Sequence, residues 1–120
     1  MHAADTTWSL ADDALAPGQS ARFRLRRPDG SLDGPLEGFV VNVGGVLHAY
    51  VNRCPHAGTP LDLTRDGFLA EDGRHLVCSR HGAVFTPETG LCVEGPCPGA
   101  SLERLVVSRN GRQLVVSCPT

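Results

Sequence analysis

Two short clusters of cysteine and histidine carry the chemistry that this sequence offers. Cys54-Pro55-His56-Ala57-Gly58 and Cys78-Ser79-Arg80-His81-Gly82 each place one thiol and one imidazole beside a glycine. A cysteine and a histidine separated by one or two residues can reach the same metal from a tight turn, and the glycine lets the backbone wrap closely around it. We therefore predict a metal site with two sulfur and two nitrogen ligands: Cys54, His56, Cys78 and His81.

Two kinds of metal centre suit this ligand set. A tetrahedral site of two cysteines and two histidines can hold structural zinc, and the same four ligands, two per iron, can hold a [2Fe-2S] cluster. A zinc finger of the familiar kind has two cysteines in one arm and two histidines in the other. Here each arm carries one of each, and this distribution favours the iron-sulfur cluster.

The spacing of the ligands resembles that of the Rieske iron-sulfur family, Cys-x-His followed after a spacer by Cys-x-x-His. In this chain 21 residues separate His56 from Cys78. Gly95-Pro96-Cys97-Pro98-Gly99 also resembles the family's third, proline-bearing loop, and the resemblance extends over about residues 8–117. It implies that the two cysteines bind an inner iron. The two histidines would bind, through Nδ1, an outer iron that accepts the electron.

The charge of such a cluster explains why imidazole ligands make reduction easier. Two ferric ions, two sulfides and two thiolates sum to zero, whereas four thiolates would leave a negative cluster. Rieske centres accordingly have potentials of about −150 to +300 mV, against about −400 mV for plant-type ferredoxins.

Four positions depart from the pattern of high-potential respiratory members of the family. Those members carry two further cysteines, which form a disulfide between the ligand loops, where this chain has Thr59 and Arg80. They also carry a serine and a tyrosine, whose hydroxyls donate hydrogen bonds toward sulfur, where this chain has Ala83 and Phe85. Because donors near sulfur stabilise the reduced state, the resemblance implies a low-potential ferredoxin.

The size of the chain bounds what it can do alone. A chain of 120 residues makes one domain, which buries about two-thirds of its unfolded surface. We expect a single domain over residues 1–120, with a core at about 8–117 and a cluster-binding part at about 52–99. The other histidines, His2, His48 and His75, are isolated in the sequence, so we expect ordinary strand or turn residues and no second, catalytic metal site. The protein is thus predicted to carry electrons without being an enzyme.

Composition excludes several classes of partner. The net charge is −2, and the sequence has neither a basic stripe nor an acidic run, so nucleic acid and anionic membranes are not expected partners. The first five residues lack the features of a secretion signal, and no apolar run approaches the length of a membrane span. We therefore expect a cytoplasmic protein.

Three cysteines remain outside the ligand set. Cys92 and Cys97 are close enough in sequence to pair if oxidised, but a reducing cytosol favours two small buried thiols beside the third loop. Cys118 lies near a terminus, and we expect it to be incidental.

Strand patterns separated by turn signals predict an all-β fold. Residues 21–26 alternate apolar residues with arginines, which is typical of a half-buried strand. Residues 39–43 and 46–51 are rich in β-branched residues and flank Gly44-Gly45, which indicates a hairpin. A second hairpin is predicted to join residues 105–108 to 113–117 through a turn that contains Asn110-Gly111.

Two further segments complete the expected scaffold. Residues 9–15 are predicted to form a short turn or helix, and residues 28–35 an exposed loop. The Rieske resemblance implies an antiparallel β-sandwich or barrel with a small cluster-binding subdomain made of two ligand loops and the proline loop.

The predicted function is therefore single-electron transfer by a soluble Rieske ferredoxin. The resemblance implies a reductase as donor and an oxygenase-type protein as acceptor, and both would dock near His56, His81 and Pro96. Arg53 and Arg80 are the charges nearest the ligands in sequence. A regulatory or accessory iron-sulfur module that carries no electrons in turnover is an alternative, as is a structural zinc domain.

Overall fold

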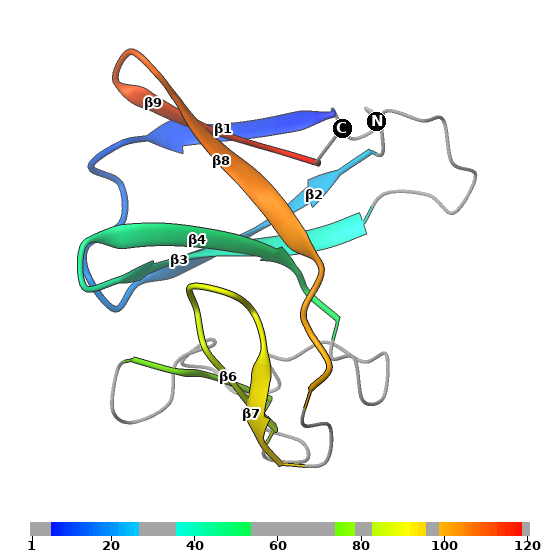
Figure 1. The fold of residues 1–120 in the computed structure, drawn as a ribbon. Helices are drawn as coiled ribbons and strands as arrows, with labels where there is room; N and C mark the ends of the chain where they lie inside the picture. The colour runs from blue at the N-terminus through cyan, green and yellow to red at the C-terminus, as the bar shows by residue number, and fades with distance from the viewer. Residues whose placement is uncertain (1–5, 27–35, 54–73, 79–82, 96–98, 119–120) are drawn as a thin grey trace.

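The described part of the chain consists of strands and turns. A computed structural model describes residues 6–26, 36–53, 74–78, 83–95 and 99–118. These residues form nine β-strands and no helix, and the strands lie in two antiparallel sheets (Figure 1). The predicted all-β fold is confirmed. In these same residues there is accordingly no helix long and apolar enough to cross a membrane.

The larger sheet has six strands in the order β1-β9-β8-β4-β3-β2 and is nearly closed into a barrel. Its strands are β1 (Thr7–Ala11), β2 (Ser20–Leu25), β3 (Leu36–Val43), β4 (Val46–Val51), β8 (Arg104–Asn110) and β9 (Gln113–Ser117). The edge strands β1 and β2 meet at a seam, where the Trp8 and Phe23 rings stack with their centroids 4.8 Å apart. Stacked aromatic side chains thus close the barrel at this seam.

Strands β4 and β8 are neighbours in the barrel although residues 52–103 separate them in the chain. They pair through Ala49 with Leu105 and through Tyr50 with Arg104. The chain therefore leaves the barrel after β4 and re-enters it beside the point of departure (Figure 1).

The smaller sheet is formed within residues 52–103, the excursion of the chain from the barrel. It has the order β5-β6-β7, with β5 at Leu76–Cys78, β6 at Ala83–Phe85 and β7 at Cys92–Glu94. It lies beside β3 and β4 (Figure 1). A buried cluster joins the two sheets, because Phe39, Val41 and Tyr50 of the barrel pack with Leu76, Ala83, Phe85, Cys92 and Leu102.

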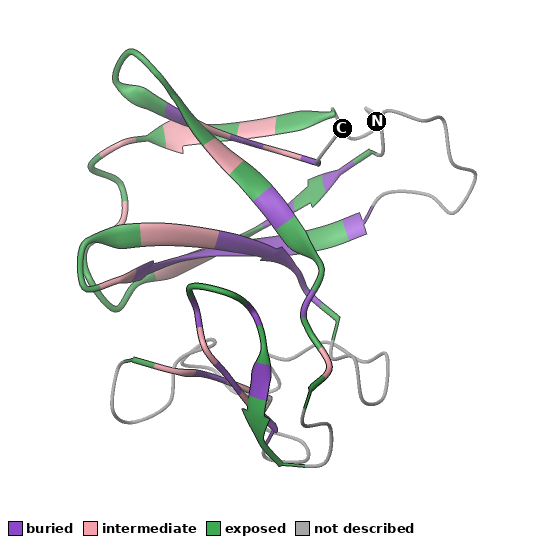
Figure 2. Cartoon of the chain, in the orientation of Figure 1, coloured by how far each residue is buried: buried purple, intermediate pink, exposed green. Residues whose placement is uncertain are grey.

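A second buried cluster fills the barrel interior. It includes Phe23, Leu25, Val40, Ala49, Val51, Leu105 and Val116. Strand β3 contributes to both clusters, so its residues 38–42 are all buried, whichever face they point to (Figure 2). The barrel core and the inter-sheet core therefore share one central strand.

The predicted half-buried strand over residues 21–26 is confirmed by β2. Phe23 and Leu25 are buried, whereas Arg22 and Arg24 are exposed. Apolar side chains thus point into the barrel, and arginines point to solvent.

Both predicted hairpins are also present. Gly44 and Gly45 connect β3 to β4 with φ values of +61° and +97°, and the flanking residues Val43 and Val46 pair across the turn. In the second hairpin Asn110 pairs with Gln113, and Gly111 between them has φ of +65°. Two-residue turns of this kind favour glycine because positive φ strains other residues.

The expectation of a turn or short helix over residues 9–15 is only partly right. Residues 7–11 form β1, which pairs with β9, and the turn begins at Asp12. The partner strand β9 supplies backbone hydrogen bonds that a local pattern does not reveal. The predicted loop over residues 28–35 lies outside the described residues.

Cys118 is not incidental to the fold. It is 7% exposed and belongs to the barrel cluster, so this terminal residue contributes to the core. Its sequence position near a terminus was a poor guide because β9 carries the chain back across the barrel.

Candidate metal centre

The second predicted ligand arm lies within the β5–β6 hairpin. Cys78 is the last residue of β5, and its register partner is Ala83, the first residue of β6. Residues 79–82, which include the predicted ligand His81, therefore connect two paired strands. The hairpin brings the start and the end of this arm to one tip of the smaller sheet.

The first predicted arm follows directly from β4. The Asn52 N–H donates to the Glu37 carbonyl at 2.8 Å, and the Val51 N–H donates to the Glu103 carbonyl at 2.9 Å. Asn52 is 6% exposed, so the backbone is held within the barrel until two residues before Cys54. Cys54 and His56 themselves lie outside the described residues, as does His81.

The ends of the proline-bearing loop are held together. The Cys92 N–H donates to the Ala100 carbonyl at 2.8 Å, and the Gly99 N–H donates to the Cys92 carbonyl at 3.2 Å. Gly95 and Gly99 have φ values of +99° and +88°, which favour glycine. The glycines of the predicted loop therefore occupy positions that require them, whereas residues 96–98 lie outside the described residues.

Cys92 occupies the expected environment of a small buried thiol. It is 2% exposed, and its thiol lies 3.2 Å from the Glu94 carbonyl oxygen, to which it can donate. Its predicted neighbour Cys97 lies outside the described residues.

A turn over residues 86–91 joins β6 to β7 and contacts the barrel. The Gly90 N–H donates to the Thr86 carbonyl at 2.7 Å, and the Thr86 N–H donates to the Leu91 carbonyl at 3.0 Å. The Tyr50 hydroxyl, from β4, donates to the Pro87 carbonyl at 2.5 Å. This turn is therefore fixed both internally and to the barrel.

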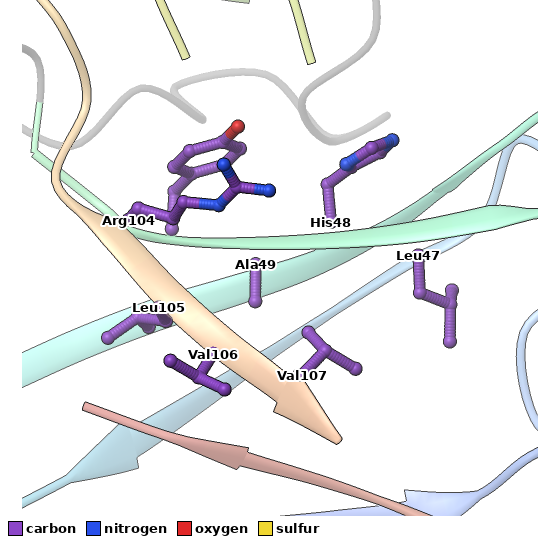
Figure 3. Close-up of a pocket in the computed structure, with 8 residues that line it drawn as sticks. Leu47, His48, Ala49, Arg104, Leu105, Val106 and Val107 are labelled. Atoms are coloured by element: carbon purple, nitrogen blue, oxygen red, sulfur yellow. The ribbon is translucent and has the colours of Figure 1, made fainter. Parts of the chain in front are cut away.

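A cleft of about 220 Å³ opens where β4 and β8 diverge. It lies beside the junction between the sheets, which we define as the contact of Tyr50 with the turn over residues 86–91. Residues 47–50 and 104–107 line the cleft. His48 and Arg104 rise on one side of the strands, opposite to Leu47 (Figure 3). The lining holds one histidine and no cysteine or carboxylate. His48 itself lies within β4, so its expected place in a strand is confirmed.

Burial shifts the pKa values of two side chains where the turn meets the barrel, and two neighbouring charges add smaller effects. Burial lowers the pKa of His48 below its ordinary value, with opposing contributions from Glu88, which raises it, and Arg104, which lowers it. Burial raises the pKa of Tyr50, and Arg104 and Glu88 again act in opposite directions. Both shifts favour the uncharged form of the side chain, so Tyr50 keeps its proton for donation.

Comparison with known proteins identifies the family to which this arrangement belongs. A family model described as the Rieske [2Fe-2S] domain matches residues 12–118. This chain belongs to the Rieske [2Fe-2S] family.

The Rieske chain has a similar sequence to known ferredoxin components. It is 32% identical over 102 residues to the ferredoxin component of biphenyl 2,3-dioxygenase from Rhodococcus jostii (strain RHA1), and the match covers 85% of this chain and 82% of that protein. It is 26% identical to the ferredoxin of carbazole 1,9a-dioxygenase from Nocardioides aromaticivorans IC177, covering 92% and 94% of the two chains with a TM-score of 0.69.

A larger protein contains the same fold. The terminal oxygenase of carbazole 1,9a-dioxygenase from Novosphingobium sp. KA1 matches 98% of this Rieske chain, with a TM-score of 0.73 and 18% identity, but the match covers only 31% of the oxygenase. At this identity the likeness concerns the fold alone.

Family membership confirms the predicted cofactor, a Rieske-type [2Fe-2S] cluster. The donor set in the sequence fits that cluster, because two thiols and two imidazoles match the mixed ligation of a Rieske centre. The described strand ends also lead into both predicted arms, since β4 precedes Cys54 and β5 ends at Cys78. The assignment of the four ligands remains a prediction.

Sequence reasoning missed two residues that shape the surroundings of the site. Tyr50 and Gly90 meet at the junction, where a Cβ on Gly90 would lie 2.7 Å from Tyr50 Cε1. The available signals were that Tyr50 is the only tyrosine of the chain and that Gly90 follows a Pro-Glu-Thr turn sequence. Neither signal reveals that the two residues are in contact.

Proposed function

We propose that this Rieske protein is a ferredoxin that carries single electrons from a reductase to an oxygenase. The observation that carries the proposal is the match to a dioxygenase ferredoxin component at 32% identity, over most of both chains. The chain serves as an electron-transfer component and not as a catalyst. We place it in the cytoplasm, where such a carrier meets a soluble reductase.

Cys54, His56, Cys78 and His81 are the proposed ligands of the cluster. When bound, the cluster accepts and releases one electron at a time. The chain's own residues orient the ligands: β4 anchors the start of the first arm, and the paired residues Cys78 and Ala83 anchor the second. The proposed unit is a single domain over residues 1–120, with its core at about 8–117 and its cluster-binding part at about 52–99.

A low potential within the Rieske range is part of the proposal. Ala83 and Phe85 stand where high-potential members carry hydroxyl donors, and both side chains are fully buried in β6. Neither side chain can donate a hydrogen bond toward sulfur. Without these donors the extra electron of the reduced state is less well stabilised.

Cluster composition and spectra test the ligand set. The protein should contain iron and acid-labile sulfide in equal amounts and show a Rieske electron paramagnetic resonance (EPR) spectrum after reduction. His81→Ala should abolish that spectrum, whereas His75→Ala, which changes a histidine outside the ligand set, should keep it. A His81→Ala protein with an unchanged Rieske spectrum would disprove the ligand assignment.

Turnover distinguishes the carrier from the regulatory alternative. The purified protein should restore substrate oxidation to a reductase and a terminal oxygenase that are inactive without it. Stopped-flow absorbance should show reduction by the reductase and reoxidation by the oxygenase, both faster than turnover. A cluster that stays in one oxidation state throughout turnover would refute the carrier function.

A further inference from the structure

Tyr50 makes a buried hydrogen bond between the two sheets. It lies on β4 of the barrel and is 1% exposed. Its hydroxyl donates at 2.5 Å to the carbonyl of Pro87, which belongs to the turn between β6 and β7 of the smaller sheet. Because a buried carbonyl that loses its donor is costly, this bond fixes the turn against the barrel.

The Tyr50 ring also packs against the backbone of the same turn. Gly90 has φ of +74°, and a Cβ added there would lie 2.7 Å from Tyr50 Cε1 and 3.2 Å from Cζ. On the barrel side the ring packs with Phe39, at 6.1 Å between centroids. The ring is therefore enclosed by both sheets, and its hydroxyl has little freedom to leave Pro87.

The two ends of this contact lead to different ligand arms. Tyr50 precedes the proposed ligand Cys54 by four residues, and β4 continues directly into that arm. Pro87 follows β6, whose first residue, Ala83, pairs with Cys78 of the second arm. The hydrogen bond thus connects the strand that starts one arm to the hairpin that carries the other.

We propose that Tyr50 is a positioning residue of the cluster site, because its hydroxyl bond to Pro87 holds the two ligand arms in register with each other. The inference rests on the proposed ligand set. A binuclear cluster shared by two arms requires a fixed separation between them, and ligand residues keep such geometry only when surrounding residues lock them. Tyr50 acts through the backbone of the turn, by way of its hydrogen bond to the Pro87 carbonyl.

The holoprotein variant Tyr50→Phe tests this role, since it removes only the hydroxyl. Visible absorbance follows cluster loss to excess chelator at a temperature where the fold is intact. The rate of loss should be about tenfold higher than in the wild type, which corresponds to an activation barrier lower by about 1.4 kcal/mol. The EPR spectrum of the reduced protein should also broaden, because the arms sample a wider range of separations.

Asn42→Ala provides the matched control. Asn42 is buried at the far end of β3, where its side chain donates to the Leu15 carbonyl and accepts from the Gly45 N–H. This variant also loses buried hydrogen bonds, but the partners of the lost bonds, Leu15 and Gly45, belong to neither ligand arm. It should lower thermal stability while leaving the rate of cluster loss and the EPR line shape unchanged.

The outcomes separate this inference from the proposed function. A Tyr50→Phe protein that keeps the wild-type rate and line shape overturns the positioning role, as does one that changes no more than Asn42→Ala. If Tyr50→Phe does not accumulate as holoprotein, Gly90→Ala presses on the same ring from the turn and should accelerate cluster loss; an unchanged rate again overturns it. A wild-type protein that takes up no iron and sulfide refutes the proposed function instead.

Discussion

Replacing Gly90 by alanine should destabilise the protein more than most single glycine substitutions, because two penalties coincide there. The φ of +74° costs an alanine about 1–2 kcal/mol. The new Cβ would lie 2.7 Å from Tyr50 Cε1, and overpacking of this kind costs about 1–3 kcal/mol. The lower entropy of the unfolded alanine chain offsets about 0.4–1 kcal/mol, so the expected loss is about 2–4 kcal/mol.

Two other glycines separate the two penalties. Gly111 has φ of +65° with nothing within 4 Å of an added Cβ, so Gly111→Ala carries the conformational cost alone, about 1 kcal/mol. Gly38 has no positive φ, but an added Cβ would lie 2.5 Å from Phe23 Cε1 and 3.0 Å from Leu105 Cδ1. Gly38→Ala therefore carries the packing cost alone, about 1–3 kcal/mol, reduced by the same unfolded-chain offset of about 0.4–1 kcal/mol.

Thermal unfolding of the three holoproteins, followed by far-ultraviolet circular dichroism without oxygen, measures these costs. For a chain of this length, 1 kcal/mol shifts the melting temperature by about 4 °C, so Gly90→Ala should melt about 8–16 °C below the wild type. A Gly90→Ala protein that melts with Gly111→Ala would show that the Tyr50 ring moves aside freely. The junction between the sheets would then not be packed as described.

Three further predictions concern acidity, potential and docking. Because burial lowers the pKa of His48 below 6.5, the unfolded chain binds the proton first, and stability should fall as the pH drops below about 6.5. Denaturant titrations at several pH values measure this, and the unfolding free energy of His48→Asn should depend less on pH. An equal pH dependence in the wild type and the variant would contradict the reasoning. Ala83→Ser should raise the reduction potential by roughly 60 mV, a tenfold change in the one-electron equilibrium, as measured by voltammetry. Phe85→Tyr tests the second missing donor in the same way. If neither variant shows a positive shift in potential, the role of these positions is contradicted. Arg53 is exposed beside the first arm, so Arg53→Glu should slow association with an acidic partner several-fold at low ionic strength, as measured by stopped flow. A decrease in the association rate that persists in high salt would exclude simple electrostatic attraction.

The parts of the fold that were predictable carry strong local signals. Gly44-Gly45 between two β-branched runs determines a hairpin with little help from distant residues, and the alternation of residues 21–26 shows which side chains enter the barrel. The ligand pattern is also local within each arm. Such features can be predicted because neighbours in sequence supply most of the physical constraint.

The smaller sheet was not predicted strand by strand, for a physical reason. Its three strands have three residues each, which is too short for an alternating pattern to stand out. Their burial comes from contact with β3 and β4 of the barrel, far away in sequence. The contact between Tyr50 and Gly90 depends on the same packing, so it is invisible until the two sheets are placed together.

The pairing of β4 with β8 has a consequence for how such a protein can change over evolution. Since Ala49 pairs with Leu105 and Tyr50 with Arg104, the barrel holds both ends of residues 52–103 close together whatever lies between them. Lengthening a closed loop is cheap, at about 0.6 kcal/mol for each doubling. The excursion can therefore gain or lose residues between these two ends while the barrel keeps its register. New redox partners can in this way be accommodated by one insertion site without redesign of the scaffold.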